Sequence, residues 1–337
     1  MINSDMYLPC KLFNPRQPRA AIARFAKGLV LAVVGVVSLL CCDGFWCPSG
    51  FAATSQSAVP AAADLPQVEA GTQCIYSDGS WEMVKETGSG WIRLTNQDGE
   101  TQVRSIDFTF QPFRYESATR QGTRNFTQAQ YLLGKHTMSL WPLATGKITR
   151  FVEVGEYSSK NTAKSRYEAY WQCEVRGTKK VTVAAGTFDA WDIGCNKYRD
   201  SFQGDSQESW SWLYVPSIHH WVSERVEGDD HSTGKNRELV AFLPDIKRLS
   251  LNAKQLGQLQ KQFQEVLEQN GNGEEDILLS ASETGLTSAV VAKDSFNRPD
   301  GMLCRHFTQR VQNGQTVQNS LGLACRGAEG IWKIPRN

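Results

Sequence analysis

The sequence predicts a mainly β protein: an antiparallel barrel or curved half-barrel, a connecting amphipathic helix, and a small, disulfide-stapled, β-rich C-terminal domain. Three observations predict this fold class. Residues 70–245 hold short apolar and aromatic runs that are separated by turn signals. Residues 247–270 carry a helical apolar repeat. The last part of the chain carries two cysteines placed symmetrically about a turn.

Residues 1–53 are expected to be a signal peptide and are set aside from the fold. Basic residues precede an apolar run over residues 28–42. A run of about 15 residues suits a secretory signal and is shorter than the roughly 20 residues of a membrane-spanning helix. Small residues at Gly50 and Ala52 favour cleavage before Ala53. The chain is therefore expected to be exported.

A lipid anchor is the alternative at the same place. Cys41 and Cys42 close the apolar run, and a lipidated cysteine there would tether the chain peripherally to a membrane. Lipidation requires a small residue just before the cysteine, whereas Leu40 precedes Cys41 and Cys41 itself precedes Cys42. Cleavage without lipidation is the preferred interpretation.

The charge balance argues against a nucleic-acid partner. Removing residues 1–52 takes away five of the 36 Lys and Arg and two of the 35 Asp and Glu, which leaves a charge near −2. No basic block of the kind that binds phosphate is present.

The large β-domain is predicted over residues 70–245, after a flexible linker over 54–69 whose residues are small and polar with prolines among them. Turn dipeptides Asp78-Gly79 and Asp98-Gly99 bracket strand-like runs. About ten strands in roughly 175 residues imply one antiparallel sheet that closes wholly or partly on itself.

An amphipathic helix and linker are predicted over residues 246–273. The helical apolar stripe consists of Leu249, Leu256, Leu259, Phe263 and Val266. The Asn-Gly-Asn-Gly sequence at 270–273 ends the helix. The stripe is expected to cover a sheet. The alternative is a short dimerising coil, whose repeat Asn252 would interrupt, so the oligomeric state is left open.

The small domain is predicted over residues 274–337. Nine residues separate Cys304 from Gly314-Gln315, and nine more separate that pair from Cys325. This symmetry predicts a long hairpin with a cross-strand disulfide near its base. A domain of roughly 60 residues has a marginal core, and closing a loop of about 20 residues contributes roughly 3 kcal/mol in the chain-entropy model. The bridge is expected to be structural.

The residues around this hairpin resemble a known family. Residues 302–307 (Met-Leu-Cys-Arg-His-Phe), 313–315, 322–326 (Gly-Leu-Ala-Cys-Arg) and 330–334 (Gly-Ile-Trp-Lys-Ile) resemble the C-terminal domain of the rickettsial-type 17 kDa surface antigen family. That family carries a C-R-x-(F/Y) strand, a Gly-rich turn, a G-x-A-C-R strand and a closing G-x-W-x-(I/V).

The resemblance implies a location in the bacterial cell envelope, usually at the outer membrane, and no catalytic residues. The chain departs from the family pattern because it lacks a clear lipobox and a glycine-rich segment. Periplasm, outer membrane and cell surface of a Gram-negative bacterium are the expected locations.

The large domain is similar, more loosely, to uncharacterised exported β-rich domains of Gram-negative bacteria. This similarity lies in residues 140–147, in residues 173–195 and in Trp212, Tyr214 and Pro216. The spacing there allows a Cys173–Cys195 disulfide between adjacent strands. Cys74 is then left over, to pair between chains or to stay buried and reduced.

No catalytic residue, cofactor or metal ligand is predicted. His219 and His220 are adjacent on an expected strand, so their side chains would point to opposite faces and would not share a metal. Asp229-Asp230-His231 is interpreted as a turn, with calcium binding as the minority interpretation. The sequence contains no nucleophile elbow, no pair of carboxylates on apolar strands and no phosphate-binding glycine loop.

The best binding hypothesis is an aromatic one. Trp191, Trp210, Trp212 and Trp221 lie in neighbouring runs, and Trp210 and Trp212 share a strand face. They form either a large aromatic core or an aromatic-lined concavity for a lipid, a glycan or a peptidoglycan strand. The sequence therefore predicts a non-catalytic envelope protein with a structural or binding role for an apolar or glycan ligand. The alternative is a periplasmic hydrolase with an unrecognised site.

Overall fold

The structure is a computed structural model that describes residues 62–117, 120–128, 139–159, 162–199, 201–202, 205–228, 234–280 and 285–335. These residues all belong to one compact unit, Ala58–Asn337. The predicted signal peptide with Cys41 and Cys42 and the Asp229-Asp230-His231 turn lie outside the described residues. The predicted domain boundaries stay a prediction.

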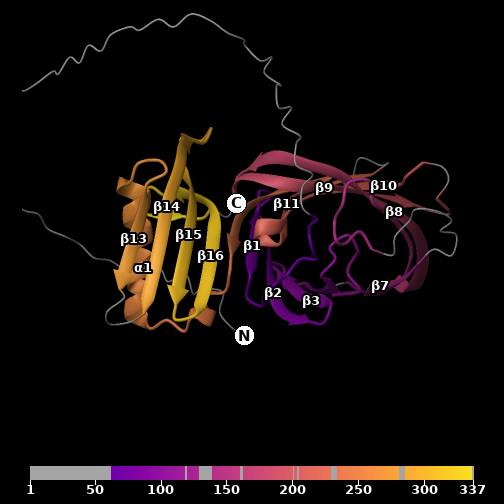
Figure 1. Ribbon diagram of the computed structural model, residues 1–337. Helices are drawn as coiled ribbons and strands as arrows, with labels where there is room; N and C mark the ends of the chain where they lie inside the picture. Colours follow the sequence, from indigo (N-terminus) through magenta and orange to yellow (C-terminus); the bar gives the residue numbers. More distant parts are fainter. Residues whose placement is uncertain are drawn as a thin grey trace, which may run out of the picture. The chain divides into compact units, whose positions relative to one another are not determined.

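Twelve strands form the barrel (Figure 1). They are β1 (Gln73–Tyr76), β2 (Trp81–Gly88), β3 (Trp91–Asn96), β4 (Thr101–Ser105), β5 (Arg114–Glu116), β6 (Arg120–Gln128), β7 (Ile148–Ser159), β8 (Thr162–Val183), β9 (Gly186–Tyr198), β10 (Glu208–Val215), β11 (His220–Gly228) and β12 (Lys235–Leu243). Each strand pairs antiparallel with the next, and β12 pairs with β1. The barrel is therefore closed, which confirms the predicted fold class and selects the closed form.

The expected count of about ten strands was too low. The strands β4 and β5 are short and only partly buried, so no apolar run marks them in the sequence. In contrast, the expected strands at 166–175 and 181–183 belong to one 22-residue strand, β8, which continues through a bulge next to Gly177. Gly177 has a φ of 141°, which a residue with a side chain rarely adopts.

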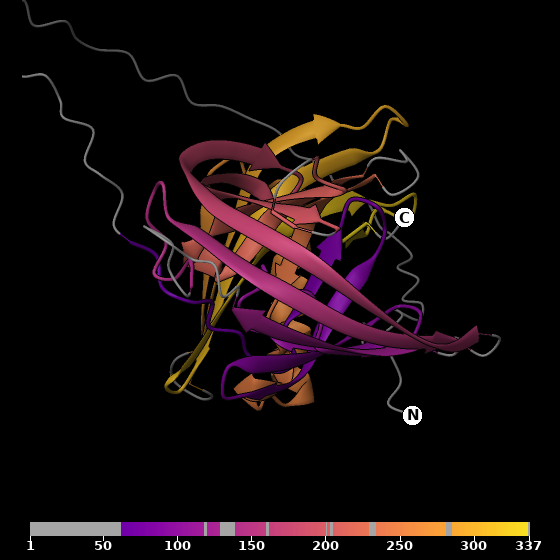
Figure 2. The ribbon, with the colours of Figure 1, turned by 90° about the vertical axis from the view of Figure 1, so that its right-hand side faces the viewer.

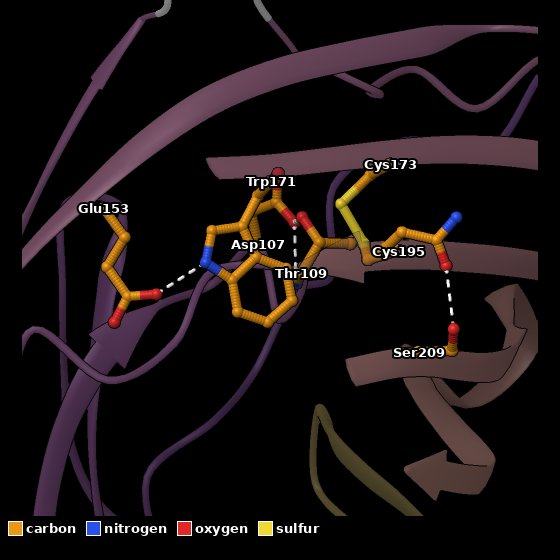
Figure 3. Close-up of a disulfide and its surroundings, with 8 residues drawn as sticks. Asp107, Thr109, Glu153, Trp171, Cys173, Cys195 and Ser209 are labelled. Atoms are coloured by element: carbon orange, nitrogen blue, oxygen red, sulfur yellow. Dashed lines mark hydrogen bonds between the residues drawn. A yellow bond between two sulfur atoms is a disulfide. The ribbon is translucent and has the colours of Figure 1, made fainter. Parts of the chain in front are cut away.

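The long strands β7 and β8 cross the barrel obliquely (magenta in Figure 2). Cys173 on β8 lies directly opposite Cys195 on β9, and the two form a disulfide. Figure 3 shows this bridge beside Trp171, whose indole N–H donates to Glu153 Oε2 at 2.6 Å. Tyr167 Oη donates to Glu153 Oε1, also at 2.6 Å, so this buried carboxylate is well solvated by protein groups.

The large aromatic core lies among β7 to β11. Trp171, Trp212, Trp221 and Tyr214 are among the largest fully buried side chains. Trp141 meets Tyr214 edge to face, with ring centroids 5.1 Å apart. Such rings bury large apolar areas, which makes them the main apolar contribution to the stability of this part of the barrel.

Five further strands, called the second sheet, follow the barrel and are hydrogen-bonded to it through the pairing of β12 with β16. They are β13 (Glu275–Ser280), β14 (Leu286–Asn297), β15 (Leu303–Asn313), β16 (Thr316–Arg326) and β17 (Trp332–Lys333). Cys304 and Cys325 lie opposite each other in the β15–β16 hairpin and form a disulfide, which confirms the predicted pairing. Cys74, the leftover cysteine, is buried and free.

The helix α1 (Ala253–Gln269) packs on this second sheet (Figure 1). Residues Val266 and Leu267 of the helix meet Val290, Ala292 and other buried side chains of the sheet. The expected role of the helix, covering a sheet, is therefore confirmed. Within the described residues, no helix has the length and apolar character needed to cross a membrane.

The predicted start of the helix was wrong. Residues Ile246–Leu249 form a separate 3₁₀ turn, η2, and Leu256 is exposed rather than part of the buried stripe. Asn252, which was expected to interrupt a coiled-coil repeat, is the N-cap of the helix. Its side chain accepts from the backbone N–H of Gln255, whose side chain accepts from the backbone N–H of Asn252. This is a reciprocal capping box.

The residues that carry the surface-antigen resemblance hold the helix on the sheet. Arg305 is buried and donates to the carbonyl oxygens of Leu267 at 2.7 Å and Asn270 at 2.8 Å, which satisfies groups that every helix C-terminus leaves free. Arg326 donates twice to Glu268, at 2.9 and 3.0 Å, and the Trp332 indole N–H donates to the same carboxylate. These motif residues therefore attach the C-terminal end of α1 to the second sheet.

The barrel and the second sheet share a seam. Besides its barrel neighbours, β12 pairs with β16, where Ala241 lies opposite Gly322. A Cβ atom added at Gly322 would lie 2.7 Å from Ala241 Cβ and 2.9 Å from Val240 O. The Cys304–Cys325 bridge and Leu323 belong to the same apolar cluster as Ile75 and Ala241. The absence of a side chain at residue 322 therefore lets the two strands approach.

We predict that Gly322→Ala destabilises the protein by about 1–3 kcal/mol, because the new methyl group must push β16 away from β12. Urea unfolding followed by circular dichroism measures the change. Gly257→Ala is the matched control: its Cβ atom would meet nothing within 4 Å on the exposed face of α1. This control should stabilise by about 1 kcal/mol, and equal effects of the two changes would contradict the seam argument.

Candidate functional site

A cavity of about 310 Å³ lies at the β1–β4 side of the barrel. Its walls come from β1 to β4, from the turn η1 (Pro216–Ile218) with the start of β11, and from the end of β12. The segment 66–69 and residues 317–319 of β16 also line it. The cavity is therefore bounded mainly by the barrel and partly by the second sheet.

Alternating positions of the strands supply the walls. On β2 the lining residues are Glu82 and Val84, and on β3 they are Ile92 and Leu94. Side chains of a strand alternate between its two faces, so such pairs point the same way. Val84, Ile92 and Leu94 form a small aliphatic cluster, on which Val68 and Ile106 pack. Branched aliphatic groups from β2 and β3 thus form one part of the lining, beside the rings of Tyr76, Phe108, Trp221 and Phe242.

A buried ionic cluster stands behind the cavity wall. Arg237 of β12 donates from Nη1 to Glu82 Oε1 at 2.9 Å and from Nε to Glu224 Oε2 at 2.5 Å. The side chains of Arg237 and Glu224 are each 6% exposed. The Trp212 indole N–H also donates to Glu224, at 3.1 Å. One guanidinium group therefore compensates two carboxylates from β2 and β11.

Aromatic rings complete the surroundings of Arg237. Its guanidinium carbon lies 4.5 Å from the ring centroid of Tyr76 and 4.8 Å from that of Trp221. The rings of Tyr76 and Trp221 stack with centroids 4.8 Å apart. A guanidinium group loses less hydration than an ammonium group on burial and is attracted to ring faces, which suits arginine to this position.

The cluster sets the charge state of the cavity wall. Burial would raise the pKa of Glu82, but Arg237 and Arg104 outweigh it and lower the pKa to about 2. Burial opposes the charge of Arg237, yet Glu82 and Glu224 raise its pKa above the ordinary value. Burial lowers the pKa of His220 to about 3, and Arg104 adds to that shift. At neutral pH, Glu82 is therefore ionised and His220 is neutral.

The phenol of Tyr76 and the thiol of Cys74, which both line the cavity, stay protonated. Burial, reinforced by Glu82, raises the pKa of the Tyr76 phenol and of the Cys74 thiol. The Tyr76 hydroxyl group lies 3.1 Å from His220 Nε2 and 3.4 Å from Glu82 Oε2. Neither group has the lowered pKa that activates a nucleophile.

Arg104 is the loosely held charge of the cavity. Its Nη2 lies 3.8 Å from Glu82 Oε2, an ion pair without a hydrogen bond. Its Nε atom is buried and has no hydrogen-bond partner. The side chain is only 12% exposed. A buried donor without an acceptor is costly, so a ligand that supplies acceptors at this place would gain free energy.

The four tryptophans that were predicted as candidates for a ligand pocket lie in different places in the structure. Trp221 lines the cavity. Trp191 and Trp212 are buried in the aromatic core, and Trp210 packs against it. Trp210 and Trp212 do share a face, with ring centroids 5.6 Å apart. Three of the four therefore contribute to the packed core and not to the lining of the cavity.

The two adjacent histidines do not both lie on a strand, although the sequence had led us to expect that they would. His219 is exposed and has left-handed backbone geometry (φ 52°), where it ends the turn η1. His220 begins β11, and its ring stacks on Trp221 with centroids 4.9 Å apart. Across the part of the chain that the structure describes, no three His, Cys, Asp or Glu side chains group as metal ligands.

Sequence reasoning missed the polar residues of this site. Glu82, Arg104 and Arg237 were given no role in the sequence analysis, because charged residues are usually exposed to solvent. A signal was available in Lys235 to Leu239, because Arg237 stands two residues before the apolar Leu239 and so shares its inward face. A charge at an inward position needs a partner, and that partner could have been sought among other strands.

Comparison with known proteins bears on the second sheet. Residues 266–333 match the family model described as 17 kDa outer membrane surface antigen. This confirms the predicted resemblance of the C-terminal region. The match includes the end of α1 and the strands β13 to β17, which are the elements that the motif residues join.

A solved structure is similar to part of this chain. It is the hypothetical lipoprotein YmcC from Escherichia coli, with 10% sequence identity and a TM-score of 0.33. The match covers 53% of this chain and 90% of YmcC. No curated protein matches the sequence.

We predict that His220 makes folding stability depend on pH. The unfolded chain gains a proton at this residue below about pH 6.5, whereas the folded protein gains it only near pH 3, so stability falls as the pH drops through this window. Between pH 7 and pH 5 this residue should account for a loss of about 2 kcal/mol, measured by urea unfolding. The variant His220→Gln should lack this part of the loss.

His219→Gln is the matched control for that experiment, because His219 is the exposed neighbour. This variant should lose as much folding stability between pH 7 and pH 5 as wild-type protein does. A loss in His220→Gln that is as large as in wild type would contradict the buried, neutral state of His220.

Proposed function

We propose that this chain is an exported, non-catalytic binding protein of the bacterial cell envelope that holds an apolar ligand in its barrel. The observation that carries the proposal is the cavity beside the Arg237 cluster. Its volume of about 310 Å³ falls at the lower end of the range of roughly 300–1,000 Å³ that ligand pockets cover. About half of its lining residues are apolar, among them Val84, Ile92 and Leu94, and the other half are polar or charged. Apolar walls hold a ligand and polar groups orient it.

The charge states around the cavity support binding rather than chemistry. A hydrolase needs an activated nucleophile, and the alternative function would have to find it here or elsewhere. The thiol of Cys74 and the phenol of Tyr76 have raised pKa values, which keeps both protonated. Neutral His220 is engaged with Tyr76 and stacked on Trp221. We therefore prefer a ligand site to an active site.

Three features support the envelope location. The sequence begins with a predicted signal peptide. Both cysteine pairs form disulfides, which persist in oxidising compartments such as the periplasm. The family matched by residues 266–333 is described as an outer membrane surface antigen. The envelope components that such a protein could meet include lipid, glycan and peptidoglycan, and the apolar wall favours the first.

We predict that mass spectrometry of the mature protein finds Ala53 as its first residue. Gly50 and Ala52 meet the small-residue preference of signal peptidase at this place. An acylated Cys41 or Cys42 at the N-terminus would instead establish a membrane tether. An unprocessed N-terminus in the native host would contradict export by this signal.

We predict that the protein binds N-phenylnaphthylamine, a neutral apolar fluorophore, and that Leu94→Trp weakens this binding at least tenfold. The larger side chain would occupy the cavity, because Leu94 belongs to its aliphatic wall. Fluorescence titration measures both affinities. Leu94→Ala enlarges the cavity instead and should keep the binding, which separates lost space from lost folding.

Leu256→Trp is the matched control, since Leu256 is exposed on α1 and is not among the residues that line the cavity. The control should bind the fluorophore as wild-type protein does. Failure of wild-type protein to bind the fluorophore, or equal weakening by the two tryptophan variants, would contradict a ligand site in the barrel.

A further inference from the structure

We propose that the barrel cavity takes a medium-length acyl chain that ends in a carboxylate, and that Arg104 binds this carboxylate. The inference rests on the proposed function and adds to it the chemical class of the ligand. It is argued from the unmade hydrogen bonds of Arg104, from the groups around it, and from the shape and chemistry of the remaining wall.

Arg104 is the charged donor of the cavity that lacks acceptors, beside the indole N–H of Trp221, which is also buried without a hydrogen-bond partner. Its side chain is nearly buried, its Nε has no partner, and its one ion pair, with Glu82, spans 3.8 Å. A planar guanidinium group can donate two parallel hydrogen bonds to one carboxylate. No other cationic side chain lines the cavity, so an acidic head group would be directed to Arg104.

The surrounding charges permit this exchange. Glu82 also faces Arg104, but Arg237 holds Glu82 through a hydrogen bond of 2.9 Å, and Arg237 is held in turn by Glu224. Glu82 therefore keeps a strong cationic partner when Arg104 turns to a ligand. His220 is neutral and Tyr76 is protonated, so neither adds a negative charge that would repel the head group. The carboxylate of Glu69 also lines the cavity and is paired with Arg248.

The rest of the wall suits an aliphatic tail. Val84, Ile92 and Leu94 form one cluster with Val68 and Ile106 packed on it. About 310 Å³ is room for a single chain of moderate length and not for a whole phospholipid. Burial of the tail would contribute roughly 0.8 kcal/mol for each methylene group.

A sugar ligand fits less well. Protein sites for sugars present free aromatic faces together with several polar groups. Here the Tyr76 and Trp221 rings stack on each other and contact Arg237, so their faces are already occupied. The aliphatic cluster of Val84, Ile92 and Leu94 offers no hydrogen bonds to hydroxyl groups, so a sugar could use only the polar part of the lining, which includes Thr72, Ser217 and Gln318. An acyl chain therefore matches the cavity better than a glycan does.

The test compares decanoate with decanol, which share one chain and differ in the head group. Isothermal titration of the full-length mature protein at pH 7 should show decanoate binding about tenfold more tightly, the effect of one charge-assisted hydrogen-bond pair. Arg104→Met should lower the affinity for decanoate to the level that decanol has. Arg104→Lys, which keeps the charge but not the planar fork, should give an intermediate affinity.

Arg93→Met is the matched control, because Arg93 lies on the neighbouring strand, is 46% exposed and pairs with Glu86. It should keep the wild-type preference for decanoate. Thermal unfolding of each variant establishes that it is folded before titration.

The outcomes distinguish this inference from the proposed function. Equal binding of decanoate and decanol would overturn the claim that the ligand ends in a carboxylate, and would leave the proposed apolar site in place. A preference that survives in Arg104→Met would overturn the assignment to Arg104. Binding of neither compound, together with no binding of N-phenylnaphthylamine, would overturn the proposed function as well. Preferential binding of a soluble oligosaccharide would replace the acyl chain by a glycan.

Discussion

The pairing of Arg237 with Glu82 and Glu224 joins the barrel where it closes. Closure depends on β1, a strand of only four residues between β2 and β12. Arg237 on β12 reaches Glu82 on β2, so the ion pair links the two neighbours of this short strand from the inside. Loss of the arginine would leave Glu82 and Glu224 with only their longer ion pairs, to Arg104 at 3.8 Å and to Lys235 at 3.6 Å. Removal of one partner of a buried pair typically costs about 3–5 kcal/mol.

The same cluster divides the barrel interior into a packed part and a hollow part. Arg237 fixes the rings of Tyr76 and Trp221, which separate the tryptophan-rich core of β7 to β11 from the space beside β1 to β4. On the hollow side the apolar inward residues of β2 and β3 are Val84, Ile92 and Leu94, next to the charged Glu82. These aliphatic side chains are smaller than the rings that fill the core of β7 to β11. A cavity results from the choice of side-chain size, and its charge state follows from the nearby guanidinium groups.

The sequence predicted the fold better than the site. Alternating apolar runs and paired cysteines depend on local spacing, so the barrel, the covering helix and the Cys304–Cys325 hairpin could all be expected. Glu82, Arg104 and Arg237 are far apart in the sequence, and only the register of a closed barrel brings them together. Residue type alone did not decide the role of the tryptophans, which could form a large aromatic core or line a concavity; Trp191 and Trp212 are core residues. Asn252 was misjudged, because its effect depends on whether it lies inside a helix or at its first position.

The pairing of β1 with β12 also has a consequence for the order in which the protein can fold. Gln73 pairs with Leu243, so the first strand has no closing neighbour until nearly the whole barrel has been synthesised or has passed through a translocation pore. The disulfide between Cys173 and Cys195 closes a loop whose ends are 22 residues apart, and the β8–β9 hairpin that contains it can form early. Contacts between sequence-distant residues form slowly. During vectorial synthesis, therefore, the edge of β1 that pairs with β12 stays unpaired, and accessible to chaperones and proteases, until β12, the last strand of the barrel, has been made.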